Sequence, residues 1–207
     1  MKRSLVFDFD GTIADTLDEG LAIYNKIAAE QGFQTVHPDE IDQFRELETR
    51  EILRRLQVPR HRVPRLLATA LRRLRRHVSR LPLIEGMTEI IPALHLQPRI
   101  LGILSSNASE NVDTFLGCHG LRNHFAFIHS LGTLRGKARE LQTIMKKCQL
   151  SPGDLLYVGD EIRNLRAAHK AGIEAVAVTW GLNSRASLAR EHPAYLLDHP
   201  SELLQLP

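Results

Sequence analysis

Two aspartates near the start of the chain, Asp8 and Asp10, have the residue type and spacing that could carry chemistry. They follow the apolar run 5–7 and precede Gly11, so they stand where a predicted strand ends. Side chains two residues apart on an extended backbone point to the same side. Two carboxylates that close repel each other unless one is protonated, hydrogen-bonded or neutralised by a cation. The pair therefore indicates a Mg²⁺ site, because Mg²⁺ binds a few carboxylates together with phosphate oxygens and water. The alternative is that both acids are turn residues after an edge strand.

A second acidic pair, Asp160 and Glu161, follows the apolar run 155–158 and opens a predicted helix. If the strand before it lies next to the first strand, Asp160 meets Asp8 and Asp10 at the switch point of an open sheet. Taken alone, this pair is better explained as a helix N-terminus, where acids are favoured by the helix dipole.

Two further polar groups stand at predicted element ends. Ser106 and Asn107 follow the predicted strand 100–105, and their hydroxyl and amide groups could hold an anion where the next helix begins. Lys137 opens a later helix and would supply a point positive charge. Taken alone, each is a weak signal, because serine and asparagine often cap helices and a lysine at a helix start is usually solvated.

The elements that must position these residues are short apolar runs alternating with helical patterns. The predicted strands are 5–9, 100–105, 125–129, 155–159, 175–180 and, more weakly, 195–197. Helical patterns cover 89–96, 109–116, 137–148 and 161–171. Such alternation predicts an α/β fold with a doubly wound, Rossmann-like parallel sheet, in which right-handed crossovers place every strand's carboxyl end at one edge.

The interval 15–82 contains helical patterns and no convincing strand, which predicts a small helical cap domain inserted after the first strand. The core domain is then 1–14 and 83–207. One amphipathic helix is predicted in the insertion, with an apolar stripe at spacings of three or four residues. The stripe consists of Leu67, Leu71, Leu74, Val78 and Leu81.

An arginine-rich segment, residues 54–80, holds ten arginines and no acid, in a chain whose net charge is only +3. We interpret most of these arginines as the solvated face of an amphipathic helix. As a hypothesis, some of these arginines face the substrate cleft. They would favour a substrate that carries negative charge besides the phosphate oxygens expected at the Mg²⁺ site. A non-catalytic protein that binds nucleic acid or an acidic partner is the alternative. Nucleic acid is not expected, because the segment has no aromatic residue on which bases could stack.

The composition is that of a soluble globular protein, with 43% hydrophobic and 25% charged residues. The two cysteines form no CxxC pair, which favours a reducing compartment. The N-terminal apolar run is too short for a secretory signal, and no run approaches the ~18 residues of a membrane span. We therefore expect a cytoplasmic protein with no membrane partner, and the sequence leaves its oligomeric state open.

Taken in order, the four polar groups resemble the four motifs of the haloacid dehalogenase-like (HAD) superfamily of phosphatases. Asp8-Phe9-Asp10-Gly11-Thr12 resembles the first motif, Ser106-Asn107 the second, Lys137 the third, and Gly159-Asp160-Glu161 the fourth. The stretch 157–172 and the helical insertion are similar to phosphoglycolate-phosphatase-like members with a small helical cap.

The resemblance implies a Mg²⁺-dependent phosphatase acting on a small phosphorylated metabolite through an aspartyl-phosphate. It implies that Asp8 is the nucleophile and that Asp10 is the general acid and base. Ser106, Asn107 and Lys137 would bind the phosphoryl group. Mg²⁺ would be held by Asp8, the Asp10 carbonyl and Asp160, with Glu161 nearby as a further ligand. A sugar phosphomutase shares these motifs and remains an alternative.

Two positions depart from the family pattern. Members with this fourth motif often carry an aspartate where Asn164 stands, so a charge near the metal site is lost, which Glu161 could compensate. The hydroxyl of the second motif could be Ser105, but we assign it to Ser106 because the asparagine that follows matches better.

Overall fold

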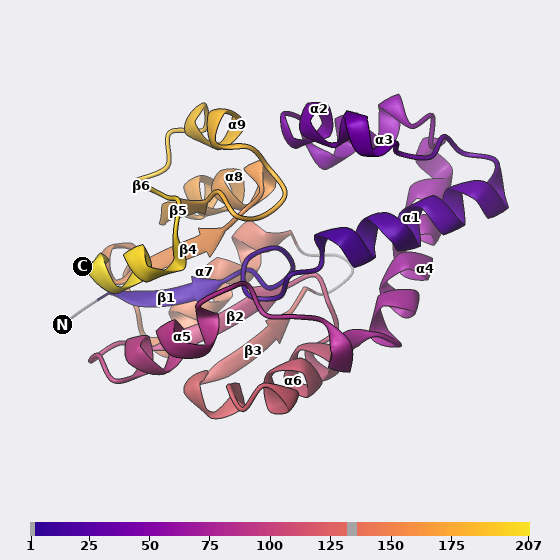
Figure 1. The fold of residues 1–207 in the computed structure, drawn as a ribbon. Coiled ribbons are helices and arrows are strands. Elements are labelled where there is room, and N and C mark those ends of the chain that lie inside the picture. The colour runs from indigo at the N-terminus through magenta and orange to yellow at the C-terminus, as the bar shows by residue number, and fades with distance from the viewer. Residues whose placement is uncertain (1–2, 132–135) are drawn as a thin grey trace.

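Six parallel strands form one sheet in the order β3-β2-β1-β4-β5-β6 (Figure 1). The computed structural model describes residues 3–131 and 136–207. The strands are β1 Ser4–Phe7, β2 Leu101–Ser105, β3 Phe127–Ser130, β4 Leu155–Gly159, β5 Glu174–Val178 and β6 Tyr195–Leu197. The chain starts in the middle of the sheet, builds outward to β3, and then returns to build from β4 to β6. This order confirms the predicted doubly wound α/β fold and places the switch point between β1 and β4.

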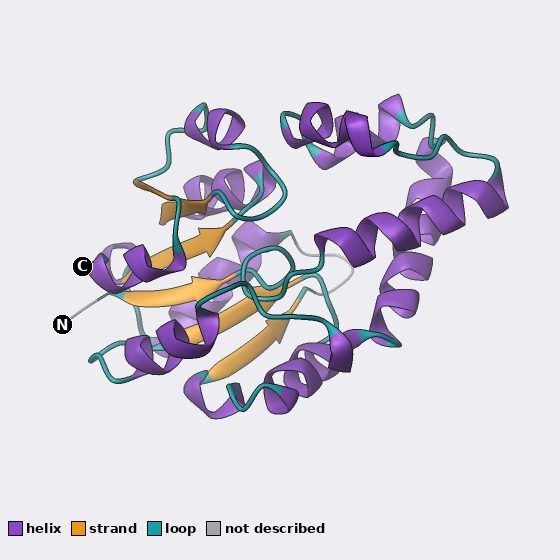
Figure 2. Ribbon diagram, viewed as in Figure 1, coloured by secondary structure: helices purple, strands orange, loops and turns teal. Residues whose placement is uncertain are grey.

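Helices cover both faces of the sheet (Figure 2). Outside the insertion they are α5 Met87–His95, α6 Ser109–Cys118, α7 Lys137–Cys148, α8 Ile162–Ala171 and α9 Arg185–Ala189, with 3₁₀ turns η4 Arg122–His124, η5 Pro152–Asp154 and η6 Pro200–Gln205. Because side chains alternate along a strand, Leu5 and Phe7 join the core beneath α5 and α6, whereas Val6 joins the core beneath α7 and α8. Both faces of β1 are therefore buried, which explains its continuous apolar sequence.

The segment predicted as a cap, residues 15–82, consists of helices joined by turns and loops and contains no strand. Its helices are α1 Leu17–Gln31, α2 Ile41–Arg45, α3 Thr49–Arg55 and α4 Val63–Arg75, with 3₁₀ turns η1 Pro38–Glu40, η2 Arg60–Arg62 and η3 Val78–Arg80. We call residues 15–82 the cap. Its two connections to the sheet lie side by side, because Asp15 N–H donates to Pro82 O at 2.9 Å and Ile84 N–H donates to Ile13 O at 2.9 Å. The predicted domain limits remain a prediction, and residues 1–2 and 132–135 of the predicted core domain lie outside the described residues.

The apolar stripe predicted for the cap is partly wrong. Leu67 is 47% exposed, whereas the neighbouring Leu66 is buried together with Leu74. The reason is that α4 ends at Arg75. Val78 lies beyond the end of α4. Its burial therefore does not follow from the helical periodicity that we used to predict the stripe.

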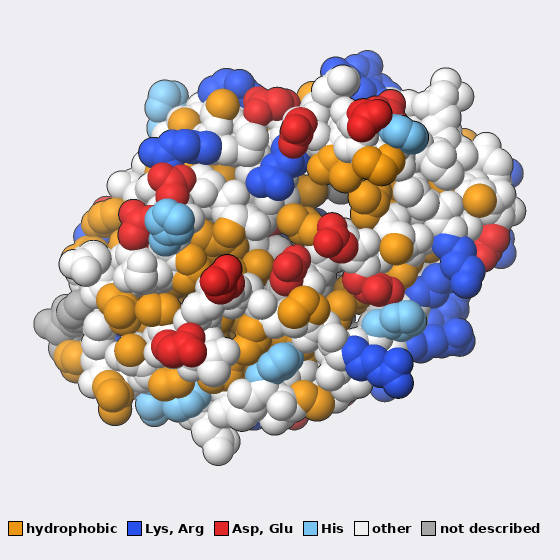
Figure 3. Space-filling model, in the orientation of Figure 1, with side chains coloured by type: hydrophobic (Ala, Val, Ile, Leu, Met, Phe, Trp, Pro, Cys, Tyr) orange, Lys and Arg blue, Asp and Glu red, His pale blue; other side chains and the backbone are white. Residues whose placement is uncertain are grey.

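Lysine and arginine side chains gather over α4 and the neighbouring part of α1, at the end of the molecule away from the sheet (Figure 3). Exposed arginines on or beside α4 include Arg65, Arg72, Arg75 and Arg76. Within the described residues, no helix is both long and apolar enough to cross a membrane.

Candidate active site

Asp8 stands directly after β1 and is buried at the switch point. Its N–H donates to Val158 O on β4 at 2.8 Å, which continues the ladder between the two strands. Its carboxylate accepts hydrogen bonds at both oxygens. Oδ1 accepts from Phe9 N–H at 2.9 Å, and Oδ2 accepts from Lys137 Nζ and Asn164 Nδ2. Residues from distant parts of the chain therefore meet at one carboxylate, and Lys137, which we predicted to bind the phosphoryl group, is one of them.

The surroundings of Asp8 keep it ionised although it is buried. Burial alone raises the pKa of this carboxyl, but the positive charges of Lys137 and Arg163 and the hydrogen bonds from Lys137 and Asn164 lower it. The net effect is a pKa below the ordinary value. A buried, ionised carboxylate with a fixed orientation is suited to act as a nucleophile.

Asp10 is in the opposite state. Burial, together with the negative charge of Asp8, raises the pKa of Asp10 to about 7, against the lowering influence of Lys137 and Asn107. Its Oδ1 is buried and has no hydrogen-bond partner among the described residues. Two carboxyls in one site thus differ in protonation at neutral pH, one ionised and one able to carry a proton. This separation is typical of a pair that divides nucleophilic and acid–base roles.

Asp160, the third acid, stands directly after β4 and is held in one position. Its Oδ1 accepts from Thr12 Oγ1 at 2.8 Å, and its Oδ2 accepts from Leu182 N–H at 2.8 Å. Two glycines leave room for it: a Cβ on Gly11 would lie 2.3 Å from Oδ2, and one on Gly181 would lie 2.2 Å from the Asp160 Cβ. The site requires glycine at both positions.

The charge around Asp160 is unbalanced. Burial, followed by the negative charges of Glu161 and Asp8, raises the pKa of Asp160 to about 7. The carboxylate of Glu161 is already engaged, since it accepts from Arg163 at 2.5 Å and from Thr49 Oγ1 of the cap at 3.1 Å. Glu161 is thus tied to Arg163 and to the cap, whereas Asp160 lies close enough to Asp8 for the two negative charges to interact.

Within residues 3–131 and 136–207, no group of three or more His, Cys, Asp or Glu side chains could hold a metal ion. Mg²⁺ does not need such a group, because it binds through one or two carboxylates and retains several waters. Asp8 and Asp160 meet that requirement, and a cation between them would offset the burial and the neighbouring negative charges that raise the pKa of Asp160.

The second predicted anion-binding group is fixed by its neighbours. Asn107 accepts at Oδ1 from Ala108 N–H at 2.9 Å and from Asn111 Nδ2 at 2.8 Å, and its side chain also lowers the pKa of the adjacent Asp10. Ser105 is fully buried, and its Oγ accepts from Asn107 N–H at 2.9 Å. This structural use of Ser105 supports the assignment of Ser106, which is partly exposed, as the hydroxyl of the second motif.

The structure thus brings together Asp8, Asp10, Asn107, Lys137 and Asp160, and Ser106 directly follows the last residue of β2. Sequence reasoning missed three supporting residues: Thr12, Asn111 and Tyr157. The hydroxyl of Tyr157 accepts from Asn164 at 3.3 Å. Asn164, which we predicted to leave a charge missing near the metal, instead donates directly to Asp8. Only the position of Thr12 directly after Gly11 could have signalled its role from the sequence.

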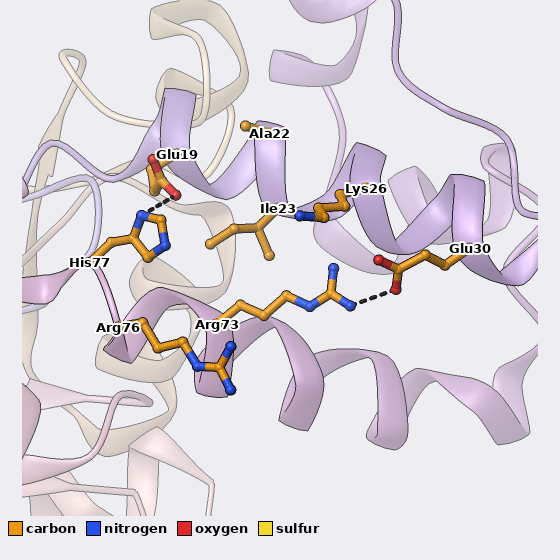
Figure 4. Close-up of a pocket in the computed structure, with 8 residues that line it drawn as sticks. All are labelled: Glu19, Ala22, Ile23, Lys26, Glu30, Arg73, Arg76 and His77. Atoms are coloured by element: carbon orange, nitrogen blue, oxygen red, sulfur yellow. Dashed lines mark hydrogen bonds and ion pairs between the residues drawn. The ribbon is translucent and has the colours of Figure 1, made fainter.

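The arginine-rich segment lies apart from these residues. A hollow of about 360 Å³ between α1 and α4 is lined in part by Arg73, Arg76 and His77, and by no residue of the four motifs (Figure 4). Arg73 is paired with Glu30 at 2.5 Å, and His77 with Glu19 at 3.0 Å, both across to α1. Both pairs thus connect one cap residue with another cap residue. They give no support to the hypothesis that some arginines face the substrate.

Comparison with known proteins assigns the chain to a class of enzymes. A family model described as haloacid dehalogenase-like hydrolase matches residues 5–178. The chain therefore belongs to the haloacid dehalogenase-like hydrolase family, which confirms the family and enzyme class predicted from the motifs.

Individual relatives narrow the comparison. The chain is 36% identical over 203 residues to a phosphoglycolate phosphatase of Synechococcus elongatus, covering 98% of this chain and 96% of the relative. It is 23% identical over 209 residues to an N-acetylmuramic acid 6-phosphate phosphatase of Pseudomonas putida, covering 97% and 94%. Among solved structures, a haloacid dehalogenase-like hydrolase from Streptococcus pneumoniae matches with a TM-score of 0.83 at 18% identity, covering 99% and 97%. That last likeness concerns the fold.

Proposed function

We propose that this protein is a Mg²⁺-dependent phosphatase that hydrolyses a small phosphate monoester, phosphoglycolate or a similar metabolite, through an aspartyl-phosphate on Asp8. One observation carries the proposal: a buried, ionised Asp8 held by Lys137 and Asn164 beside a second carboxyl, Asp10, whose pKa is raised to about 7. The relative with 36% identity supports the choice of substrate class.

In the first step, a carboxylate oxygen of Asp8 bonds to phosphorus as the bond to the ester oxygen breaks, and Asp10 donates its proton to the departing alkoxide. In the second step, Asp10 takes a proton from the water that attacks the aspartyl-phosphate, which releases inorganic phosphate and restores Asp8. One residue serves both steps because its pKa lies near the working pH.

The remaining residues handle charge. Lys137, Ser106 and the amide of Asn107 would bind the phosphoryl oxygens and oppose their growing charge in the transition state. Mg²⁺, held by Asp8, Asp160 and the Asp10 carbonyl, would reduce the repulsion between the Asp8 carboxylate and the anionic phosphate. The engagement of Glu161 by Thr49 and Arg163 favours a supporting role for Glu161 over direct ligation.

The experiment is a panel of phosphate esters tested on the wild type and on Asp8→Asn, with Mg²⁺ and with EDTA. The panel includes 2-phosphoglycolate, N-acetylmuramate 6-phosphate and pyrophosphate. We expect Mg²⁺-dependent release of phosphate from the wild type and a loss on the order of 10⁴-fold in the variant. A phosphorylated protein trapped in acid should disappear with Asp8→Asn. Undiminished hydrolysis by that variant would rule out Asp8 as the nucleophile.

A further inference from the structure

Asn183 lies in the loop between β5 and α9 and is only 2% exposed. It follows Leu182, whose N–H holds Asp160, but the motifs give it no role. The backbone N–H and the side-chain amide of Asn183 form hydrogen bonds with the loop that carries Asp160 and with the cap. Its hydrogen bonds link these two parts of the molecule.

On the core side, Asn183 fixes the loop that carries the third acid. Its backbone N–H donates to Asp160 O at 3.2 Å, and its Oδ1 accepts from Ile162 N–H at 3.0 Å. Ile162 is the first residue of α8, where a backbone N–H has no partner inside the helix. The loop 160–162 is therefore bounded on both sides by bonds to a single residue.

On the cap side, the same side chain holds the end of α2. Its Nδ2 donates to Arg45 O at 3.0 Å and to Leu47 O at 2.9 Å, so both amide hydrogens are used on the cap. Arg45 is the last residue of α2, where carbonyl groups lack helical partners. Ser184 N–H also donates to Arg45 O at 2.9 Å.

We propose that Asn183 is a positioning residue that couples the seating of the cap segment 45–47 to the geometry of the loop 160–162. When the cap lifts away, the buried amide loses both acceptors at once, and a buried donor left unpaired is unfavourable. The amide then turns to find water, and its bond to Ile162 N–H is lost with that turn. A seated cap therefore favours an ordered acid loop, and an ordered loop favours a seated cap.

A second contact also links the cap to the loop 160–162. Thr49 of the cap donates to Glu161, the residue between Asp160 and Ile162. By contrast, Arg190 pairs with Glu46 at 2.8 Å across the same boundary, but this pair is exposed and does not touch the acid loop. Arg190 therefore provides a matched control: it crosses from core to cap without the proposed coupling.

The test is hydrogen–deuterium exchange on the whole chain without ligand, comparing wild type, Asn183→Ala and Arg190→Ala. In Asn183→Ala we expect exchange to accelerate by about tenfold or more in two separate segments, 45–49 and 160–165. In Arg190→Ala, both segments should exchange at nearly the wild-type rate, because an exposed ion pair contributes little to stability. Acceleration of just one segment by Asn183→Ala, or of both by Arg190→Ala, would overturn the coupling.

Asn183→Asp provides a second test should the alanine variant fail to fold. It keeps an acceptor for Ile162 N–H and removes the donors to the cap, so 45–49 should exchange faster while 160–165 stays protected. Unchanged exchange at 45–49 would contradict the proposal.

The importance of Asn183 for catalysis rests on the proposed function. Asn183→Ala should lower kcat/KM for the preferred ester by about 10- to 100-fold through kcat, with Arg190→Ala within about twofold of wild type. Because exchange is measured without substrate, the two proposals can fail separately. If both segments accelerate in Asn183→Ala but the wild type hydrolyses no phosphate ester, the proposed function is wrong and the coupling stands. If the wild type is an active phosphatase but the two segments respond independently, the coupling is wrong and the proposed function stands.

Discussion

The sheet edge and the cap use charge in opposite ways. At the sheet edge, Asp8 and Lys137 are buried and pair across 129 positions of sequence. In the cap, Arg54 pairs with Glu51 one helical turn away, and Arg73 pairs with Glu30 on the adjacent helix. The first pair forms only because the whole fold brings its members together, whereas the cap pairs need only a single helix or the packing of two neighbouring cap helices.

This difference indicates where function lies. A buried charge is unfavourable unless the fold supplies partners for it, so a cluster of buried charges signals a use for them. An exposed pair contributes little to stability and is screened by salt. The four tests below measure that contrast, in order of expected effect.

The largest effect is expected for Asp10→Asn. The variant cannot donate or accept the proton, so kcat should fall by about 10²- to 10⁴-fold. In the wild type, the step that needs protonated Asp10 should slow as the pH rises through its pKa, and the variant should lack that alkaline limb in the pH profile of kcat. Asp39→Asn, an exposed acid of the cap, is the control and should keep wild-type kcat. A similar loss in both variants would remove the contrast between the two regions.

Lys137→Met should lower the free energy of unfolding by about 3 kcal/mol, because Asp8 is left buried without its main positive partner. Urea denaturation in EDTA measures this effect. Lys146→Met, on the exposed side of the same helix, should be nearly neutral. Equal stability of the two variants would mean that the buried pair contributes nothing to the fold.

A smaller loss is expected in the cap from Leu74→Ala, about 2–3 kcal/mol, since this buried side chain joins the main hydrophobic core. Leu67→Ala is the same chemical change on an exposed side chain of α4 and should cost less than about 0.5 kcal/mol. Chemical denaturation of both variants also checks which face of α4 is buried. If Leu67→Ala were the more damaging, the described helix orientation would be wrong.

The smallest effect is expected for the double change Arg72→Ala and Arg75→Ala. Both side chains are exposed on α4, so hydrolysis of the preferred ester should stay within about twofold of wild type. Retention on a heparin column should fall as positive charge is removed. A tenfold loss of hydrolysis would instead revive the hypothesis that these arginines face the substrate.

The sequence predicted the sheet and the acid cluster because both depend on short local signals. Each strand is an apolar run followed at once by polar residues, and parallel strands bring those ends to one edge. The helices of the cap were harder to predict, because amphipathic periodicity does not show where a helix ends. The predicted stripe ran to Leu81, whereas α4 ends at Arg75, and the stripe wrongly placed Leu67 on the buried face. Asn183 was also missed, because its role lies in bonds to two backbone segments that are adjacent only in the folded chain.

The hydrogen bonds between Asp15 and Pro82, and between Ile84 and Ile13, have a consequence for how this molecule can vary. Because the 66 residues from 16 to 81 begin and end at neighbouring points, their number and sequence can change without shifting the register of any strand, and the entropic cost of a longer loop rises only slowly. The length and sequence of the cap could thus change while the residues at the edge of the sheet stay in place.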